Sequence, residues 1–145
     1  MKTLKTKKLT VEDYPLADTQ PENIFGKRGL ALDDITLEAV INGQVEMADL
    51  QITPKALRDQ GEIANDAGRP TLALNFERAA ELVAVPQELI MSTYELLRPG
   101  RAKTKQEIVE RAQLLRAIYG ANSIADFILE AAEIYEKRGL FTFRF

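Results

Sequence analysis

Start and stop signals for short helices divide the chain after residue 33, and this punctuation limits the fold more than any other feature. Thr53 followed by Pro54 suits the N-cap and first turn of a helix, whereas glycine suits the left-handed residue just beyond a helix end. Interruptions fall at Gly43, Gly68-Arg69-Pro70, Pro86, Arg98-Pro99-Gly100, Gly120 and Gly139. The pattern predicts an all-α fold of several packed helices. It leaves open whether a helix begins at Pro70 or one long helix bends there.

Apolar residues recur at helical spacing within these segments and indicate the faces that pack inward. The predicted stripes are Leu57, Ala64 and Ala67; Leu72, Phe76, Ala79, Ala80 and Val83; Leu89, Ile90, Tyr94 and Leu97; Ile108, Ala112, Leu115 and Tyr119; and Phe127, Ala131, Ile134 and Tyr135. Thr104 and Glu107 are predicted to form a capping box, in which each side chain binds the other's backbone N–H. Glu107 with Arg111, and Glu133 with Lys137, stand four residues apart and predict ion pairs on exposed faces.

The first 32 residues show no sustained period, although they are rich in apolar side chains. Proline and glycine interrupt the segment at Pro15, Pro21, Gly26 and Gly29. Long structureless stretches are uncommon inside compact domains, so an apolar but aperiodic segment is expected to lie on its own helices or on another chain. We therefore predict an extended partner-binding arm at residues 1–32 and a helical domain at residues 33–145.

The chain contains no histidine and no cysteine, which removes the usual near-neutral acid–base group, the thiol nucleophile and the zinc thiolate. A net charge of −3 argues against a nucleic-acid partner, because duplex binders usually carry a basic surplus. No apolar run approaches the roughly 18–20 residues of a membrane span. The basic N-terminus is not followed by an apolar stretch, as a secretory signal would be. These features predict a cytoplasmic protein without a membrane or nucleic-acid partner.

Three groups of polar residues were weighed as sites of chemistry. Glu130 and Glu133 stand three apart, but the Glu-x-x-His pairs of di-iron helices need histidine, so solvation is the favoured role. Asp33-Asp34 lacks EF-hand spacing, and helix capping by Asp34 or by Thr36 is favoured there. Gly26-Lys27-Arg28-Gly29 lacks the spacing of a phosphate-binding loop, so a turn or partner-contact loop is favoured.

Other segments left two interpretations open. Arg98 and Arg101 flank a helix stop and suit either an anion site or a structural or interface role. The run from Asn75 to Leu82 sets small residues beside an aromatic one and suits core packing or subunit packing equally. Three phenylalanines in the last six residues predict a tail that docks on this chain or on a partner.

Ordered short runs over some 120 residues resemble the small (gamma) subunit of adenosylcobalamin-dependent diol and glycerol dehydratases. They are Asp13-Tyr14-Pro15-Leu16-Ala17, Leu32 to Glu38, Gly43-Gln44-Val45, Ile52-Thr53-Pro54, Ile63 to Arg69, Asn75 to Leu82, Val85-Pro86, Tyr94 to Pro99 with Arg101, Thr104 to Glu107, and Phe127, Glu130, Ala131, Ala132 and Tyr135. No single run is diagnostic, but their order and spacing make a chance match improbable.

The resemblance implies a non-catalytic helical subunit of a hydro-lyase that contains large, medium and small chains, two of each. In that family the large subunit is a TIM barrel that holds the substrate, and adenosylcobalamin lies between the large and medium subunits. The implied reaction converts 1,2-propanediol or glycerol to the aldehyde by radical chemistry. Only about a dozen residues precede Asp13, whereas relatives sent to microcompartments often carry a longer extension, so encapsulation stays open.

The resemblance implies no catalytic, metal or cofactor-binding residue on this chain, and the expected contacts are with partner subunits. The predicted interface residues are Tyr14, Pro15, Leu16, Phe76, Arg78, Arg98, Pro99 and Arg101. The alternative is a free-standing helical interaction or regulatory module outside any enzyme complex.

Overall fold

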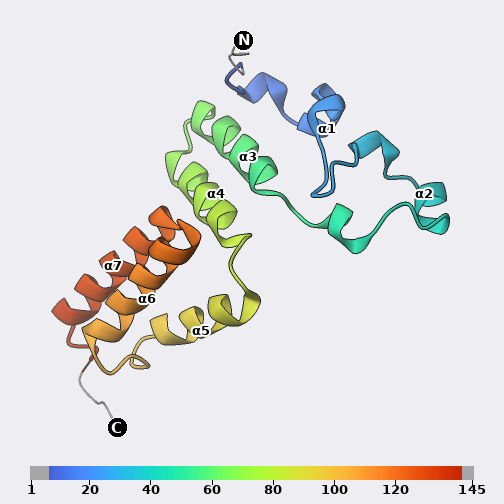
Figure 1. Cartoon of the computed structure of the whole chain (residues 1–145). Coiled ribbons are helices and arrows are strands. Elements are labelled where there is room, and N and C mark those ends of the chain that lie inside the picture. The colour runs from blue at the N-terminus through green and yellow to red at the C-terminus, as the bar shows by residue number, and fades with distance from the viewer. Residues whose placement is uncertain (1–6, 142–145) are drawn as a thin grey trace, which may run out of the picture. The chain divides into compact units, whose positions relative to one another are not determined.

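Helices and helical turns make up the regular structure of the protein, for which a computed structural model describes residues 7–141 (Figure 1). The α-helices are α1 (Leu16–Thr19), α2 (Leu37–Ile41), α3 (Pro54–Asp66), α4 (Pro70–Leu82), α5 (Gln87–Leu97), α6 (Lys105–Tyr119) and α7 (Asn122–Lys137). Short 3-10 helices are η1 (Val11–Asp13), η2 (Pro21–Asn23), η3 (Leu32–Asp34) and η4 (Met47–Leu50). Within the described residues there is no strand, only an isolated bridge between Phe25 and Ala31. The predicted all-α class is confirmed.

The chain divides into two compact units, Met1–Ala80 and Glu81–Phe145. The boundary falls near the end of α4, so the second unit contains α5, α6 and α7.

An antiparallel pair of helices, α6 and α7, forms the centre of the second unit (Figure 1). The Thr104 hydroxyl caps α6 by accepting a hydrogen bond from the N–H of Glu107, and Gly120 ends that helix with φ of 63°. A left-handed residue there costs glycine little and lets the chain reverse, so α7 starts two residues later. The predicted N-cap and the glycine stop are both confirmed.

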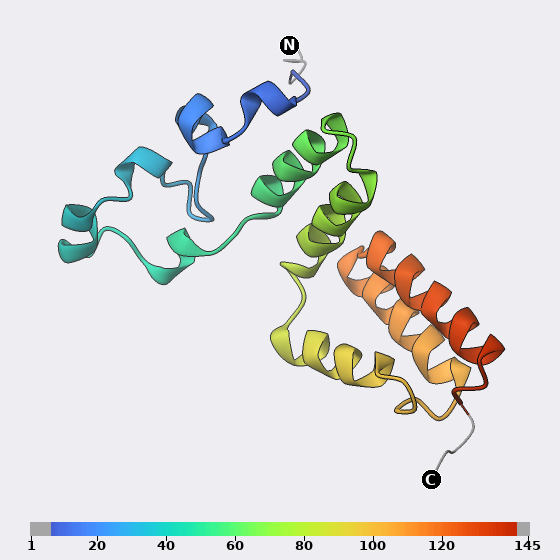
Figure 2. The ribbon, with the colours of Figure 1, turned by 180° about the vertical axis from the view of Figure 1, so that it is seen from behind.

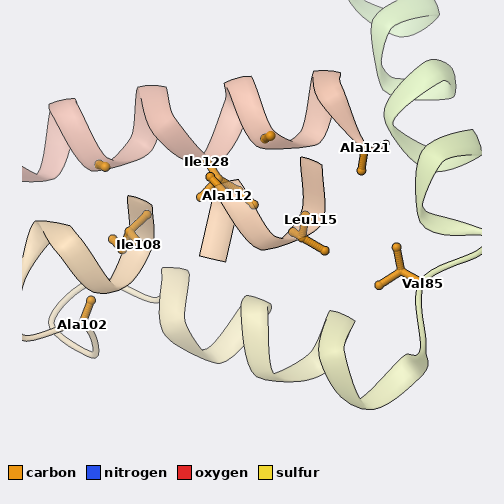
Figure 3. Packing of buried hydrophobic residues seen from close by; sticks show 9 residues of the cluster. Val85, Ala102, Ile108, Ala112, Leu115, Ala121 and Ile128 are labelled. Carbon is orange, nitrogen blue, oxygen red and sulfur yellow. The ribbon is translucent and has the colours of Figure 1, made fainter. Parts of the chain in front are cut away.

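Aliphatic side chains from α6 and α7 fill the core of this unit. Ile108 and Leu115 on α6 and Ile128 on α7 are at most 1% exposed and point into the space between the helices, and Val85 and Ala102 close the cluster (Figure 3). Burial of a large aliphatic side chain is worth about 1.5–3 kcal/mol, so these three side chains stabilise the unit strongly. The predicted stripe on α6 is confirmed.

Polar contacts add to this core at the ends of its helices. The Glu81 carboxylate accepts hydrogen bonds from the backbone N–H groups of Ser123 and Ile124, each at 2.9 Å. Glu81 therefore does for α7 what an N-cap side chain usually does, since Ala121 offers no side-chain acceptor. The Tyr135 hydroxyl donates to the carbonyl of Leu97 at the end of α5.

The first unit is organised around α3 and α4, which lie side by side (Figure 2). Thr53 caps α3 and Pro54 occupies its first turn, as predicted. A new helix begins at Pro70 after Gly68, whose φ of 73° stops α3, so the alternative of one bent helix is excluded. Gly61 lies against α4, and a Cβ there would make ordinary van der Waals contact with the Cβ of Phe76 at 3.4 Å.

Residues 7–32 form short turns that are fastened to α3 through backbone groups. The N–H of Leu9 donates to Glu62 at 3.0 Å, and the N–H of Val11 donates to Asp66 at 2.9 Å. Leu16 is 8% exposed and is the buried side chain of the short helix α1. The segment thus lies at least partly on its own helices, and its predicted role in partner binding stays a prediction.

The segment between residues 31 and 52 contains α2 and η4 at the edge of the first unit (Figure 2). Thr36, rather than Asp34, caps α2 by accepting from the N–H of Ala39 at 3.1 Å. Gly43 follows α2 with φ of 72°, and η4 forms a single turn before α3.

The predicted inward faces of α5 and α7 were partly wrong. Tyr94 is 62% exposed, whereas Thr93 is the buried residue of α5. On α7 the buried residues are Ala125, Ile128 and Ala132, and Phe127 and Ile134 lie on an exposed flank. Small alanines let α6 approach closely, so the buried face follows shape as well as side-chain size.

Two predicted ion pairs and the reciprocal capping box also differ from the structure. The Glu107 carboxylate accepts from the N–H of Lys103 at 3.2 Å instead of from Thr104. Arg111 donates to the hydroxyls of Ser92 and Thr93, which joins α6 to α5 and leaves the predicted Glu107–Arg111 pair unformed. Contacts between helices outweigh an exposed pair within one helix, which is worth only about 0.2–0.5 kcal/mol.

Candidate subunit interface

The predicted contact residues of the arm lie at one rim of a groove. Tyr14 is 61% exposed and Pro15 is exposed, whereas Leu16 is buried. The groove has a volume of about 350 Å³, and Phe25 and Lys55 also line it. An exposed tyrosine above an apolar groove is a surface that a partner side chain can fill.

Phe76 and Arg78 lie on α4 and are half-buried. Phe76 packs near Gly61, and the Arg78 guanidinium donates to the side chain of Asn75 at 3.3 Å on the same helix. Nearby, Arg58 forms an ion pair with Glu77 at 3.0 Å that joins α3 to α4. Of the two roles considered for the run from Asn75 to Leu82, core packing between α3 and α4 accounts for Phe76.

Arg98, Pro99 and Arg101 lie on an exposed loop between α5 and α6. The loop is held at both ends, because the Leu97 carbonyl accepts from Tyr135 and Ala102 is buried in the core. Arg98 forms an ion pair with Glu95 at 3.2 Å, one turn earlier. Arg98 and Arg101 are thus presented on a fixed loop.

One outward face of α5 was not predicted from the sequence. Met91 and Tyr94 are 52% and 62% exposed, and because they stand three residues apart they share a side of the helix that the buried Thr93 does not occupy. Methionine, tyrosine and arginine are enriched in the centres of protein interfaces. The signal was present in the spacing of residues 91, 94 and 98, but Tyr94 had been assigned to the buried stripe.

A second missed feature is a concentration of exposed apolar side chains in and around α2 and η4. Leu37, Ile41 and Met47 are 75–77% exposed, which is more than any other large apolar residue of the described chain. Val40, Leu50 and Ile52 are 49–60% exposed. The helical segments that carry these six residues are too short to show a helical period of apolar residues in the sequence.

The polar residues considered as sites of chemistry either form structural contacts or do not come together in a metal site within the described residues. Gly26-Lys27-Arg28-Gly29 forms a turn, in which Arg28 pairs with Asp49 at 3.0 Å, as the turn interpretation predicted. Lys105 bridges Glu133 and Glu136 at 2.6 and 2.7 Å, so Glu133 pairs chiefly with Lys105 rather than with Lys137. Among residues 7–141, no three carboxylates gather in an arrangement that could hold a metal ion.

Hydrogen bonds shift the pKa values of Lys105, Glu133 and Asp13. The hydrogen bond to Glu133 raises the pKa of Lys105, and the same contact lowers the pKa of Glu133, with a smaller contribution from Lys137. The backbone N–H of Thr10 lowers the pKa of Asp13. All three shifts favour the charged forms, through an ion pair for Lys105 and Glu133 and chiefly through hydrogen bonds for Asp13.

Two further features of the described residues are the length and polarity of the helices and the position of Phe141 near the C-terminus. The helices in the described part of the protein are too short or too polar to cross a membrane. Of the phenylalanine-rich tail, Phe143 and Phe145 lie outside the described residues. Phe141 is half-buried and packs beside Tyr135, with ring centroids 6.3 Å apart.

Comparison with known proteins places this chain in a family of enzyme subunits. Residues 9–142 match the model of the family described as the dehydratase small subunit. The chain is 49% identical over 128 residues to the propanediol dehydratase small subunit of Citrobacter freundii, which covers 88% of this chain and 74% of that protein. It is 48% identical over 128 residues to the propanediol dehydratase small subunit of Salmonella typhimurium strain LT2, with 88% and 73% covered. The chain therefore belongs to the dehydratase small-subunit family and forms part of a dehydratase enzyme complex with partner subunits.

Proposed function

We propose that this chain is the non-catalytic small subunit of a dehydratase that converts 1,2-propanediol or glycerol to the corresponding aldehyde, and that it supports assembly with a large and a medium subunit, two of each chain in the complex. The names of the two relatives support propanediol as the substrate class. The chain would then act through the surfaces it offers to its partners rather than through an active site of its own.

The observation that carries this proposal is that several large apolar side chains are exposed in each of the two units. In the first unit, Leu37, Ile41 and Met47 are at least 75% exposed, and in the second unit Met91 and Tyr94 on α5 are at least 52% exposed. Single exposed apolar residues are normal, but groups of them mark protein interaction sites. The Tyr14 rim and the fixed Arg98 loop add the polar anchors that interfaces use.

The donor groups of this chain do not fit a cobalt corrin. Without histidine or cysteine, the chain offers cobalt neither an imidazole nor a thiolate ligand. As the family resemblance implies, adenosylcobalamin, which would supply the radical, is assigned to the large and medium subunits. The whole complex is expected in the cytoplasm, with microcompartment association left to direct localisation.

Reconstitution tests the proposal. Large and medium subunits from the same source would be mixed with adenosylcobalamin and 1,2-propanediol, and aldehyde would be measured as this chain is added. Activity should rise and saturate, Arg98→Ala and Tyr14→Ala should need more chain to reach the plateau, and Glu130→Gln should match wild type. Turnover by this chain alone, or no gain on mixing, would refute the proposal.

A further inference from the structure

The stretch of residues 31–52 differs in charge from the rest of the chain. It contains no lysine or arginine, and its acidic residues are Asp33, Asp34, Glu38, Glu46 and Asp49. Because the whole chain carries a net charge of −3, the remaining residues together are net positive. The net negative charge of the protein therefore comes from this one stretch, although other acidic residues lie elsewhere in the chain.

The same stretch carries the most exposed apolar side chains of the described chain. We call it the acidic apolar face, and its apolar members are Leu37, Val40, Ile41, Met47, Leu50 and Ile52, which are 49–77% exposed. Leu37 and Ile41 stand four residues apart on α2 and share one side of that helix. Around α2, the carboxylates of Asp33, Asp34 and Glu38 are also exposed.

Hydrogen bonds and close packing hold the η4 part of the acidic apolar face in place. The Asp49 side chain is fully buried, and it accepts from Arg28 at 3.0 Å and from the N–H of Glu46 at 2.8 Å. Gly26 lies so close that a Cβ there would be 2.9 Å from the carbonyl oxygen of Asp49. These contacts tie η4 to the turn at residues 26–29, so binding does not have to order this part of the face first.

We propose that the acidic apolar face docks into an apolar groove of a partner dehydratase subunit, and that lysine or arginine side chains line the rim of that groove. The inference rests on the proposed function and names the surface and chemistry through which it works. The exposed leucine and isoleucine side chains would lose contact with water in the groove, while Asp34 and Glu38 would meet the basic rim. Complementary charge of this kind fixes the register of a partner and speeds its association.

Charge distinguishes this occupant from two others. A symmetric pair of copies would set the same patch of each against the other and bring the carboxylates of both chains together. An anionic membrane surface would repel the same carboxylates. A basic protein groove both covers the apolar side chains and neutralises the acidic ones.

The test uses the full-length tagged chain, co-expressed with its large and medium subunits, and measures retention of those subunits on an affinity resin. One variant, Leu37→Ser with Ile41→Ser, removes apolar contact, and another, Asp34→Lys with Glu38→Lys, reverses charge. Each should lower the apparent affinity by about tenfold or more, because centrally placed contacts dominate binding. Control variants Ile118→Ser and Glu130→Lys, exposed on the second unit, should stay within about twofold of wild type. Far-UV circular dichroism would confirm that each variant is folded.

The outcomes separate the two proposals. Normal retention by both face variants, with wild type binding its partners, would overturn the docking face and leave the proposed function standing. Loss in the apolar variant alone would overturn the basic rim. Failure of the wild-type chain to retain either subunit would overturn the proposed function together with this inference. Self-association or vesicle binding that the face variants abolish, with partner retention intact, would assign the face to another occupant and overturn the proposal.

Discussion

The two units of the chain are stabilised in different ways. The second unit has an aliphatic core in which Ile108, Leu115 and Ile128 are at most 1% exposed. In the first unit, the large buried side chains Leu16 and Ile63 are still 7–8% exposed, and much of the order comes from polar contacts such as that between Arg28 and Asp49. The difference indicates that the second unit supplies stability, whereas the first unit depends more on specific polar contacts and offers the larger apolar surface.

Removal of a core side chain should give the largest effect. Leu115→Ala is expected to lower the free energy of unfolding by about 3 kcal/mol, because it removes buried methyl groups and leaves a cavity that α6 and α7 cannot close. Urea unfolding followed by circular dichroism would measure the change. The control Leu114→Ala, on the same helix but 37% exposed, should cost clearly less. Equal losses at the two positions would contradict the core described here.

The polar contact in the first unit should be worth less. Arg28→Met removes the cation from the buried Asp49 carboxylate, and we expect this to cost about 1–2 kcal/mol, since hydrogen bonds to charged groups are stronger than neutral ones. Hydrogen exchange at the backbone amides of Glu46 and Asp49 would report the loss locally, while amides of α6 and α7 stay protected.

Arg116→Met is a matched control for that experiment. It breaks the ion pair of Arg116 with Asp126, in which both side chains are exposed. Exposed pairs contribute about 0–1 kcal/mol, so exchange in the first unit should not change. Protection at Glu46 and Asp49 that survives Arg28→Met would show that the first unit does not depend on this contact.

Local signals in the sequence predicted helix ends well, because the groups involved are neighbours in the chain. Thr36, Thr53 and Thr104 each bind the N–H three residues later, and the glycine stop at Gly120 is left-handed. Contacts between distant residues were not predictable in the same way. Glu81 caps a helix that begins some 40 residues later, and nothing near Glu81 in the sequence announces this role.

The interface was harder to predict than the helix ends for a related physical reason. A stripe of large apolar residues has the same spacing whether it faces the core or a partner, so Phe127 and Ile134 were assigned inward although they lie on an exposed flank. The alanines beside Ile128 form the true inner face because they permit close approach. Only the packed structure distinguishes a stripe that faces the core from one that faces outward. It also shows that Tyr94 and the apolar residues of the acidic apolar face are exposed.

The smallest expected effect is a pH dependence of the ion pairs formed by Lys105. Its contact with Glu133 raises the pKa of Lys105 above the ordinary 10.5 and lowers the pKa of Glu133 below 4.5. A raised lysine pKa gives stability that is present below about pH 10.5 and is lost as pH rises through the folded-state value. A lowered glutamate pKa gives stability that is present above about pH 4.5 and is lost as pH falls through the folded-state value.

Wild type should therefore exceed Lys105→Met in melting temperature by a small, constant margin between these limits, and the margin should shrink at both ends. Asp13 sharpens the contrast between the units, because the lowered pKa of Asp13 predicts that Asp13→Asn loses its difference from wild type only on the acid side. A margin for Lys105→Met that grows above pH 10.5 would show that the pairs with Glu133 and Glu136 do not stabilise the fold.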